Sequence, residues 1–140
     1  MQTVLPVRPA TRSLIIMMAL FVAACASSPQ RPQLIGERAQ ARWDSLLAGN
    51  VEEAYQYLSP GYRSSVSLEQ YQRKLRTQKV LWTGAEYIDS DCLDSVCKVQ
   101  ISLNFSLVGV LPGVRRYNGK QEIDESWVNS EGKWWLVPEN

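Results

Sequence analysis

The sequence has no histidine, almost no net charge, and no hydrophobic run of bilayer-spanning length. Histidine is the usual general base near neutral pH and the commonest metal ligand, so its absence removes both of those routes to chemistry. Lys and Arg number 15 against 14 Asp and Glu, a net charge of +1. A charge balance this even gives no reason to expect a nucleic-acid partner. The length of 140 residues predicts one domain.

The longest apolar run lies near the N-terminus and covers Ser13 to Ala24, 12 residues. A helix needs about 20 residues to span a bilayer. Arg8 and Arg12 precede the run, and the first acidic residue is Glu37. A short apolar run behind positive charges is typical of a secretory signal rather than a membrane span. We therefore predict that residues 1–24 are a signal peptide.

The run ends in "VAAC", Val22 to Cys25, which resembles the lipobox of bacterial lipoproteins. The resemblance implies cleavage before Cys25, a diacylglycerol on its thiol and a fatty acid, such as palmitate, on its new amino group. Two or three acyl chains anchor a protein firmly in a membrane, because each buried CH₂ contributes about 0.8 kcal/mol. The alternative is ordinary cleavage at "ACA", Ala24 to Ala26, which would discard Cys25 with the signal.

Position 26 is Ala rather than Asp, which by the same resemblance implies an outer-membrane address facing the periplasm. Residues 25–33 continue with Ser, Pro and Gln, a composition typical of a flexible tether. Removing the signal takes away Arg8 and Arg12, which leaves 13 basic and 14 acidic residues. The remaining chain has no polybasic patch, so attachment to the membrane is expected through the lipid.

Residues 34–140 are expected to form the folded domain. Apolar residues recur at helical spacing in three stretches and then alternate with polar residues, most strictly from Val99 to Leu107. Three helices before a run of antiparallel strands predict an α+β fold with helices packed on one sheet face. The expected helices are Leu34–Leu47, one capped by Asn50 and one capped by Ser67, and the expected strands are Lys79–Asp91, Lys98–Leu107, Tyr117–Asn129 and Lys133–Pro138. Between the second and third helices, "SPG" at Ser59–Gly61 predicts a turn and "YRSSV" a short extended piece.

The stretches "ARWDSLLAGNVEEAYQYLSPGYR" and "WVNSEGKWWLVP" resemble the nuclear transport factor 2-like superfamily. The resemblance covers roughly 34–138 and implies three helices closing one side of a strongly curved sheet of about four long strands, a cone with an internal cavity. The chain is similar to small bacterial envelope proteins of that superfamily that carry no assigned activity. Since the superfamily holds isomerases, cyclases and dehydratases as well as binding domains, fold alone chooses no function.

Family active sites give no catalytic residue here. Dehydratase-type sites of the superfamily use His, which is absent, and the Asp-and-Tyr pattern of the isomerases matches no positions in this chain. From the residues themselves, Glu125 is the one weak candidate. It shares a strand face with Ile123 and Trp127, and an acid on an apolar face can act as a proton donor or base. A salt bridge or a solvated edge is the alternative interpretation.

Cys92 and Cys97 lie at a predicted hairpin turn with four residues between them. In an exported protein such a pair is expected to form a disulfide. The spacing is not that of a Cys-x-x-Cys redox motif, and two thiols without histidine are too few for zinc. We therefore expect neither a metal nor another cofactor. The pairing leaves Cys25 as the odd cysteine, which favours lipidation.

Tryptophan is abundant, with five in the chain. Trp82, Phe105, Trp127 and Trp135 are candidates to line an apolar pocket, although packing in the core is the alternative. Adjacent Trp134 and Trp135 must point to opposite faces of the sheet. Arg115 and Arg116 follow an apolar loop that is either a partner-docking segment or a plain connection.

Together these patterns predict a lipid-anchored, non-catalytic protein of the bacterial envelope that binds a protein partner or a small apolar ligand. The first alternative is a small cavity enzyme of isomerase or cyclase type, using Glu125 or an Asp with Tyr hydroxyls. The second is a structural homodimer that packs sheet against sheet.

Overall fold

The computed structural model describes residues 34–111 and 113–139. The predicted signal peptide, Cys25 and the tether therefore lie outside the described residues. The elements are α1 (Ile35–Leu47), α2 (Val51–Tyr55), α3 (Pro60–Ser65), α4 (Leu68–Arg76), β1 (Val80–Leu93), β2 (Val96–Leu111), β3 (Val114–Ser130) and β4 (Lys133–Val137). Among the described residues no helix is both long and apolar enough to cross a bilayer.

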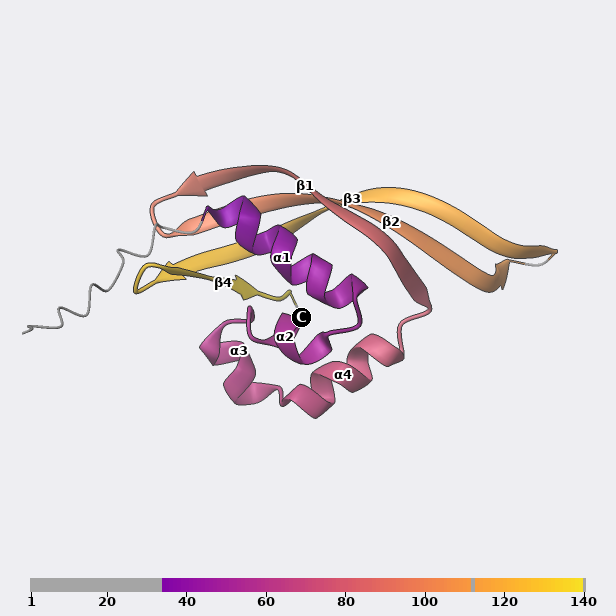
Figure 1. Ribbon diagram of the computed structural model, residues 1–140, viewed down its shortest axis with the longest axis horizontal. Coiled ribbons are helices and arrows are strands. Elements are labelled where there is room, and N and C mark those ends of the chain that lie inside the picture. The colour runs from indigo at the N-terminus through magenta and orange to yellow at the C-terminus, as the bar shows by residue number, and fades with distance from the viewer. Residues whose placement is uncertain (1–33, 112, 140) are drawn as a thin grey trace, which may run out of the picture.

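The four strands form one antiparallel sheet in the order β1-β2-β3-β4, so each strand pairs with its neighbour in sequence. The four helices lie on the same side of this sheet, with α1 directly against it and α2, α3 and α4 further out (Figure 1). The hairpin of β2 and β3 extends well beyond the helices on one side. Helices that precede an antiparallel sheet place the fold, in broad outline, in the α+β class.

The finer prediction of a three-helix, cone-shaped nuclear transport factor 2-like fold is wrong. Four short helices precede the sheet, because Pro60–Ser65 forms α3 where the sequence predicted a turn and an extended piece. The Ser59 hydroxyl accepts a hydrogen bond from the Tyr62 N–H at 3.2 Å, and Pro60 occupies the first helical position. These are strong helix-start signals. The last strand is also short, with five residues.

Two predicted helix caps had opposite outcomes. The side chain of Asn50 makes no capping hydrogen bond at the start of α2, so that prediction is wrong. The capping box of α4 is confirmed: Gln70 N–H donates to the Ser67 hydroxyl at 3.2 Å, and the Ser67 N–H donates to Gln70 Oε1 at 2.8 Å. The N–H groups of Ser67 and Gln70, which have no partner within the helix, are thus each hydrogen-bonded by the side chain of the other residue.

The core lies between the sheet and the helices, and it includes Tyr55 of α2 and Tyr71 of α4. The alternation of β2 places Val99, Ile101 and Leu103 on the buried face, each with no exposed surface. Strand β3 runs beside β2, with Glu125 opposite Val99 and Trp127 opposite Cys97. The same alternation therefore places Glu125 on the buried face.

The first turn of α1 approaches β1 closely at Gly36. A Cβ on Gly36 would lie 2.8 Å from two ring carbons of Tyr87, whose hydroxyl is hydrogen-bonded to Ser90 Oγ at 2.9 Å. We expect Gly36→Ala to destabilise the protein by about 1–3 kcal/mol, because the cost of overpacking exceeds the stability that a helix usually gains when Ala replaces Gly. The matched control is Gly61→Ala in α3, where nothing lies within 4 Å. There we expect a gain of about 0.5–1 kcal/mol. Urea unfolding of both variants measures the difference, and equal effects would contradict the close contact.

Candidate functional site

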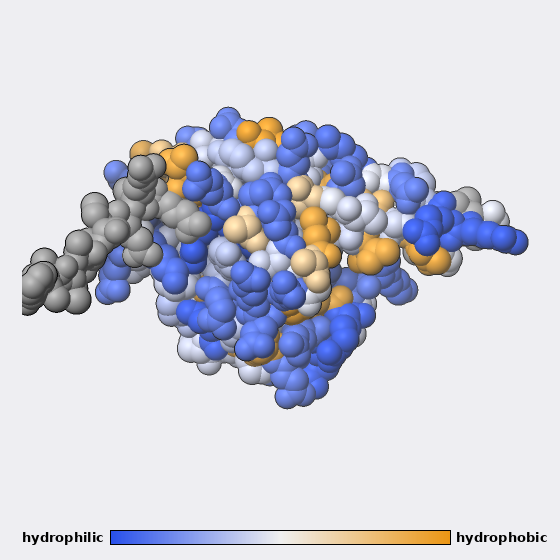
Figure 2. Space-filling model, in the orientation of Figure 1, coloured by the Kyte–Doolittle hydropathy of each residue, from blue (hydrophilic) through white to orange (hydrophobic). Residues whose placement is uncertain are grey.

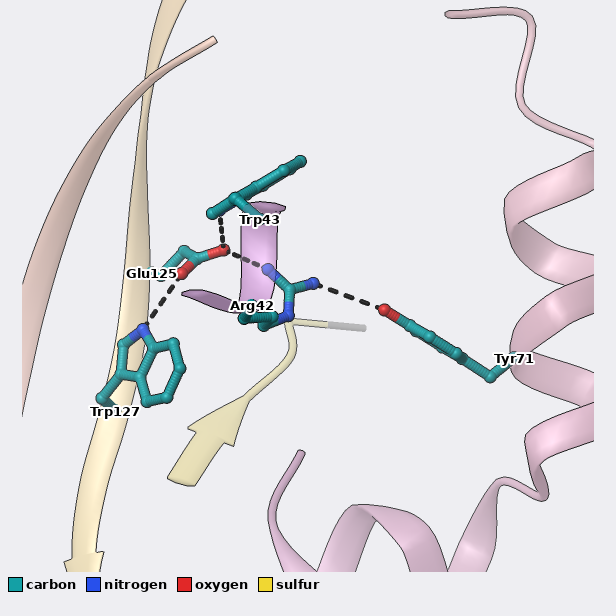
Figure 3. Close-up of polar contacts among 5 residues, drawn as sticks. All are labelled: Arg42, Trp43, Tyr71, Glu125 and Trp127. Atoms are coloured by element: carbon teal, nitrogen blue, oxygen red, sulfur yellow. Dashed lines mark hydrogen bonds and ion pairs between the residues drawn. The ribbon is translucent and has the colours of Figure 1, made fainter. Parts of the chain in front are cut away.

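A buried ion pair joins helix α1 to strand β3. Arg42 Nη1 lies 2.8 Å from Glu125 Oε1, and the two side chains are only 9% and 7% exposed. Arg42 sits beside Trp43 on α1, while Glu125 sits between Ile123 and Trp127 on the buried face of β3. Figure 3 shows the two charged groups pointing at one another from these elements.

Glu125 accepts hydrogen bonds from three donors. Besides the guanidinium, Trp43 Nε1 donates to Oε1 at 3.0 Å and Trp127 Nε1 donates to Oε2 at 3.0 Å (Figure 3). Burying a carboxylate is costly unless it is paired and hydrogen-bonded, and here both conditions hold. The arrangement also gives partners to two indole N–H groups that would otherwise be orphaned in the core.

Arg42 is held on its other side as well. Its Nη2 donates to the Tyr71 hydroxyl at 3.4 Å, and its guanidinium carbon lies 5.0 Å from the centre of the Trp43 ring. The hydrogen bond to Tyr71 connects the ion pair to α4. Helix α1, strand β3 and the outer helix α4 are therefore joined through a single guanidinium.

The structure thus places Glu125 on an apolar face, in the salt bridge that was the alternative interpretation. A general acid or base must reach the proton that it transfers. Both oxygens of Glu125 already accept hydrogen bonds from protein donors, and Trp43 and Trp127 are themselves 5% and 0% exposed. Sequence reasoning missed Arg42, because a charge beside an apolar stripe is common on any amphipathic helix.

The four candidate pocket aromatics lie in three different places. Trp82 and Phe105 pack edge to face with ring centres 6.3 Å apart, and Trp82 packs on Trp43 at 5.9 Å. Trp127 is fully buried in the core. Trp135 lies on β4 with three cationic side chains over its ring.

Phe105 is the one candidate aromatic that lines either of two surface depressions in the described part of the chain. The first, about 830 Å³, lies at the α1–α2 junction and α4 and is lined by Gly49, Asn50, Val51, Glu52, Glu53, Gln56, Gln72, Leu75 and Arg76. The second, about 690 Å³, is lined by Thr83, Asn104, Phe105, Arg116, Asn118, Gly119 and Lys120. Most residues in both linings are polar or charged, although more of the surface of the first depression is apolar than polar.

Arg115 and Arg116 are exposed at the start of β3. Arg116 pairs with Val108 across the β2–β3 hairpin, and its Nη1 donates to Ser106 Oγ at 3.4 Å. The register shifts between Val108 and Leu111, so this connection is a bulged hairpin.

Cys92 and Cys97 face each other across the β1–β2 hairpin and are joined by a disulfide, which is compatible with the pairing expected from the sequence. Their Cα atoms are 4.0 Å apart. Cys97 is fully buried and lies opposite Trp127 on β3. The disulfide therefore joins the hairpin end to the part of the sheet that holds Glu125.

No family model matches the sequence, and no curated protein matches it either. Among solved structures, the chain is similar to the solution structure of a SEC-C motif containing protein from Rhodopseudomonas palustris. The TM-score is 0.56 with 10% sequence identity, over 73% of this chain and 73% of that chain. At this identity the likeness concerns the fold alone.

The predicted membership in lipoproteins with a nuclear transport factor 2-like domain is therefore wrong. A solved structure with a similar fold is that of a SEC-C motif containing protein, and the four-helix arrangement also departs from the predicted cone. The motifs that suggested the resemblance were a helix pair and a Trp-rich hairpin. Both are explained by local pattern and core packing, which many α+β domains share. Cys25 lies outside the described residues, and its lipidation stays a prediction.

Proposed function

We propose that this protein is a lipid-anchored, non-catalytic binding protein of the bacterial cell envelope, on the periplasmic side of the outer membrane. The observation that carries the proposal is "VAAC", Val22 to Cys25, directly behind a short apolar run with arginines before it. The disulfide between Cys92 and Cys97 supports export, since such bonds persist in oxidising compartments. It also leaves Cys25 as the one cysteine available for a lipid.

The non-catalytic part of the proposal is supported by the interior. Glu125, the acid that the sequence favoured for chemistry, is held by Arg42, Trp43 and Trp127. A carboxylate with three fixed donors in a packed core serves stability rather than proton transfer. The isomerase or cyclase alternative needs an open pocket over a buried acid, and no observation favours it.

A protein partner is favoured over a small apolar ligand. Of the aromatic side chains expected to line a pocket, Trp127 fills the core, and Trp82 and Phe105 pack on one another. Figure 2 shows hydrophobic residues in small, separate patches among hydrophilic ones on the visible face. A lipophilic ligand would need one concave apolar site, whereas protein partners bind surfaces of mixed polarity.

The anchor is tested by locating the full chain in a bacterium with two membranes. We expect the wild-type chain in the outer-membrane fraction and the Cys25→Ser chain in the soluble periplasmic fraction, because the acyl chains supply the attachment. Ser27→Ala, two positions away, is the matched control and should fractionate as wild type does. A wild-type chain that is soluble, or a Cys25→Ser chain that stays in the membrane, would refute the anchor.

The partner is tested by crosslinking in intact cells. We expect the wild-type chain to crosslink to a second protein species of the envelope. Crosslinks to a second copy alone, together with a dimer mass by light scattering of the purified full chain, would favour the homodimer instead. Size exclusion of the same sample shows directly whether the purified chain is a monomer or a dimer.

A further inference from the structure

One face of the sheet carries no helix. The four helices lie on the other side, where Ile101 and Leu103 of β2 are fully buried (Figure 1). Because side chains alternate along a strand, Ser102 between them points to the helix-free face. The pairing register places Glu86 of β1 and Glu122 of β3 directly opposite Ser102, one on each side. The helix-free face therefore carries a row of Glu, Ser and Glu across three strands.

The neighbouring rows of the helix-free face are acidic as well. In the next row toward the β1–β2 turn, Asp89 and Asp124 lie on either side of Gln100. In the row after it, Asp91 lies opposite Lys98, the one cation within these rows. All five acids are exposed, and none of them forms an ion pair with a described residue. The acidic face is our name for these five residues: Glu86, Asp89, Asp91, Glu122 and Asp124.

Ser102, in the central row, is a buried hydroxyl without a hydrogen-bond partner among the described residues. It is 3% exposed, and no donor or acceptor contacts its buried Oγ. Such a group costs free energy, and native proteins rarely leave one. Glu86 and Glu122 flank it from both neighbouring strands. A positively charged donor between the two glutamates would pair with their carboxylates and donate to Ser102 Oγ.

We propose that the acidic face binds a segment of a protein partner that is rich in Lys or Arg. A Lys ammonium has three donors and an Arg guanidinium has five, so one such group can serve Glu86, Glu122 and Ser102 together. Complementary charge of this kind also steers the two proteins together and selects the partner. A bound metal ion is less suited, because the described residues include no group of three His, Cys, Asp or Glu arranged to hold one.

The two ends of the acidic face differ, which sets the orientation of the partner segment. Beside the β1–β2 turn, the last row of the same face is apolar, with Leu93 79% and Val96 48% exposed. At the opposite end, Lys120 lies across from Asn104, one row beyond Glu122. Lys120 repels a cation, whereas Leu93 and Val96 offer a contact to an apolar side chain. The segment therefore carries an apolar residue at the end that lies nearest the β1–β2 turn.

This inference rests on the proposed function, because it gives the chemistry of the expected protein partner. Crosslinking in intact cells separates the two, with wild type compared with the double variant Glu86→Gln/Glu122→Gln. We expect the double variant to lose most of the crosslink. Equal crosslinking of both chains to the same protein would overturn this inference and leave the proposed function standing. A wild-type chain that crosslinks to no second protein would instead remove the proposed function.

The direct test is titration of the full chain into a fluorescent peptide of alternating lysine and alanine with leucine at one end. An extended peptide of about seven residues spans the roughly 20 Å from Val96 to Ser102 along β2. We expect saturable binding that weakens as salt is added, because exposed charges are screened. Glu86→Gln/Glu122→Gln should weaken binding about tenfold, since two exposed ion pairs are lost. Ser102→Ala should weaken it about fivefold, the effect of one hydrogen bond.

The matched control is Glu52→Gln/Glu53→Gln, which removes the same charge from exposed positions of α2. It should bind the peptide as wild type does, and thermal unfolding of each variant checks that it is folded. Ser102→Ala should unfold no earlier than wild type, because its hydroxyl has no partner to lose. Equal weakening by the two double variants, or unchanged binding by Ser102→Ala, would overturn the proposal. So would saturable calcium binding that excludes the peptide, or a salt-sensitive dimer that Glu86→Gln/Glu122→Gln abolishes.

Discussion

Glu125→Gln is expected to destabilise the protein by about 3–5 kcal/mol, the largest single effect that the structure predicts. Breaking a buried ion pair from one side leaves an uncompensated charge in the core. Here that charge is on Arg42, which lies 2.8 Å from the lost carboxylate and whose side chain is only 9% exposed. The new amide also places its NH2 group at one of the two oxygen positions, where either Trp43 or Trp127 already donates. Denaturant unfolding measures the loss.

The matched control is Asp124→Asn, one residue away on the other face of β3. Asp124 is exposed and lies opposite Gln100, so its change should stay within about 0.5 kcal/mol. The double variant Arg42→Met/Glu125→Gln removes the stranded charge, and we expect it to cost less than the two single changes added together. Equal small effects for Glu125→Gln and Asp124→Asn would contradict the ion pair.

Reduction of the Cys92–Cys97 disulfide is expected to lower the free energy of unfolding by about 2 kcal/mol, the chain-entropy value for so short a loop. The expected loss shows as a lower urea midpoint for wild type in reductant. The variant Cys92→Ala/Cys97→Ala lacks the bond, so its midpoint should not respond to reductant. Two free thiols in the native, exported protein, measured before any reduction, would contradict the bond.

Periodicity predicted much of the local structure. Alternation correctly marked Val99, Ile101 and Leu103 as buried residues of β2, and the Ser67–Gln70 pair correctly marked the start of α4. These signals succeed because side-chain direction follows directly from backbone repeat. The helix α3 was missed because Ser59, Pro60 and Gly61 indicate a turn as readily as a helix start, and only the tertiary context decides.

The contacts between residues far apart in the sequence could not be predicted in the same way. The face of Glu125 followed from alternation, but its partner Arg42 lies 83 residues earlier in the chain. The cations over the Trp135 ring, Arg38, Arg63 and Lys133, come from three elements that have no common motif. Pairing across such distances depends on how α1, α3 and β4 pack, which no local pattern encodes. The family resemblance failed for a related reason, since it rested on local motifs rather than on packing.

The most direct test of the account is the intact mass of the protein purified from its native envelope, with Cys25→Ser measured in parallel. The account predicts a chain that begins at Cys25 and is heavier than its sequence by a diacylglycerol and a fatty acid, a gain that Cys25→Ser lacks. An unlipidated chain that begins directly after Ala26 would contradict the lipid anchor.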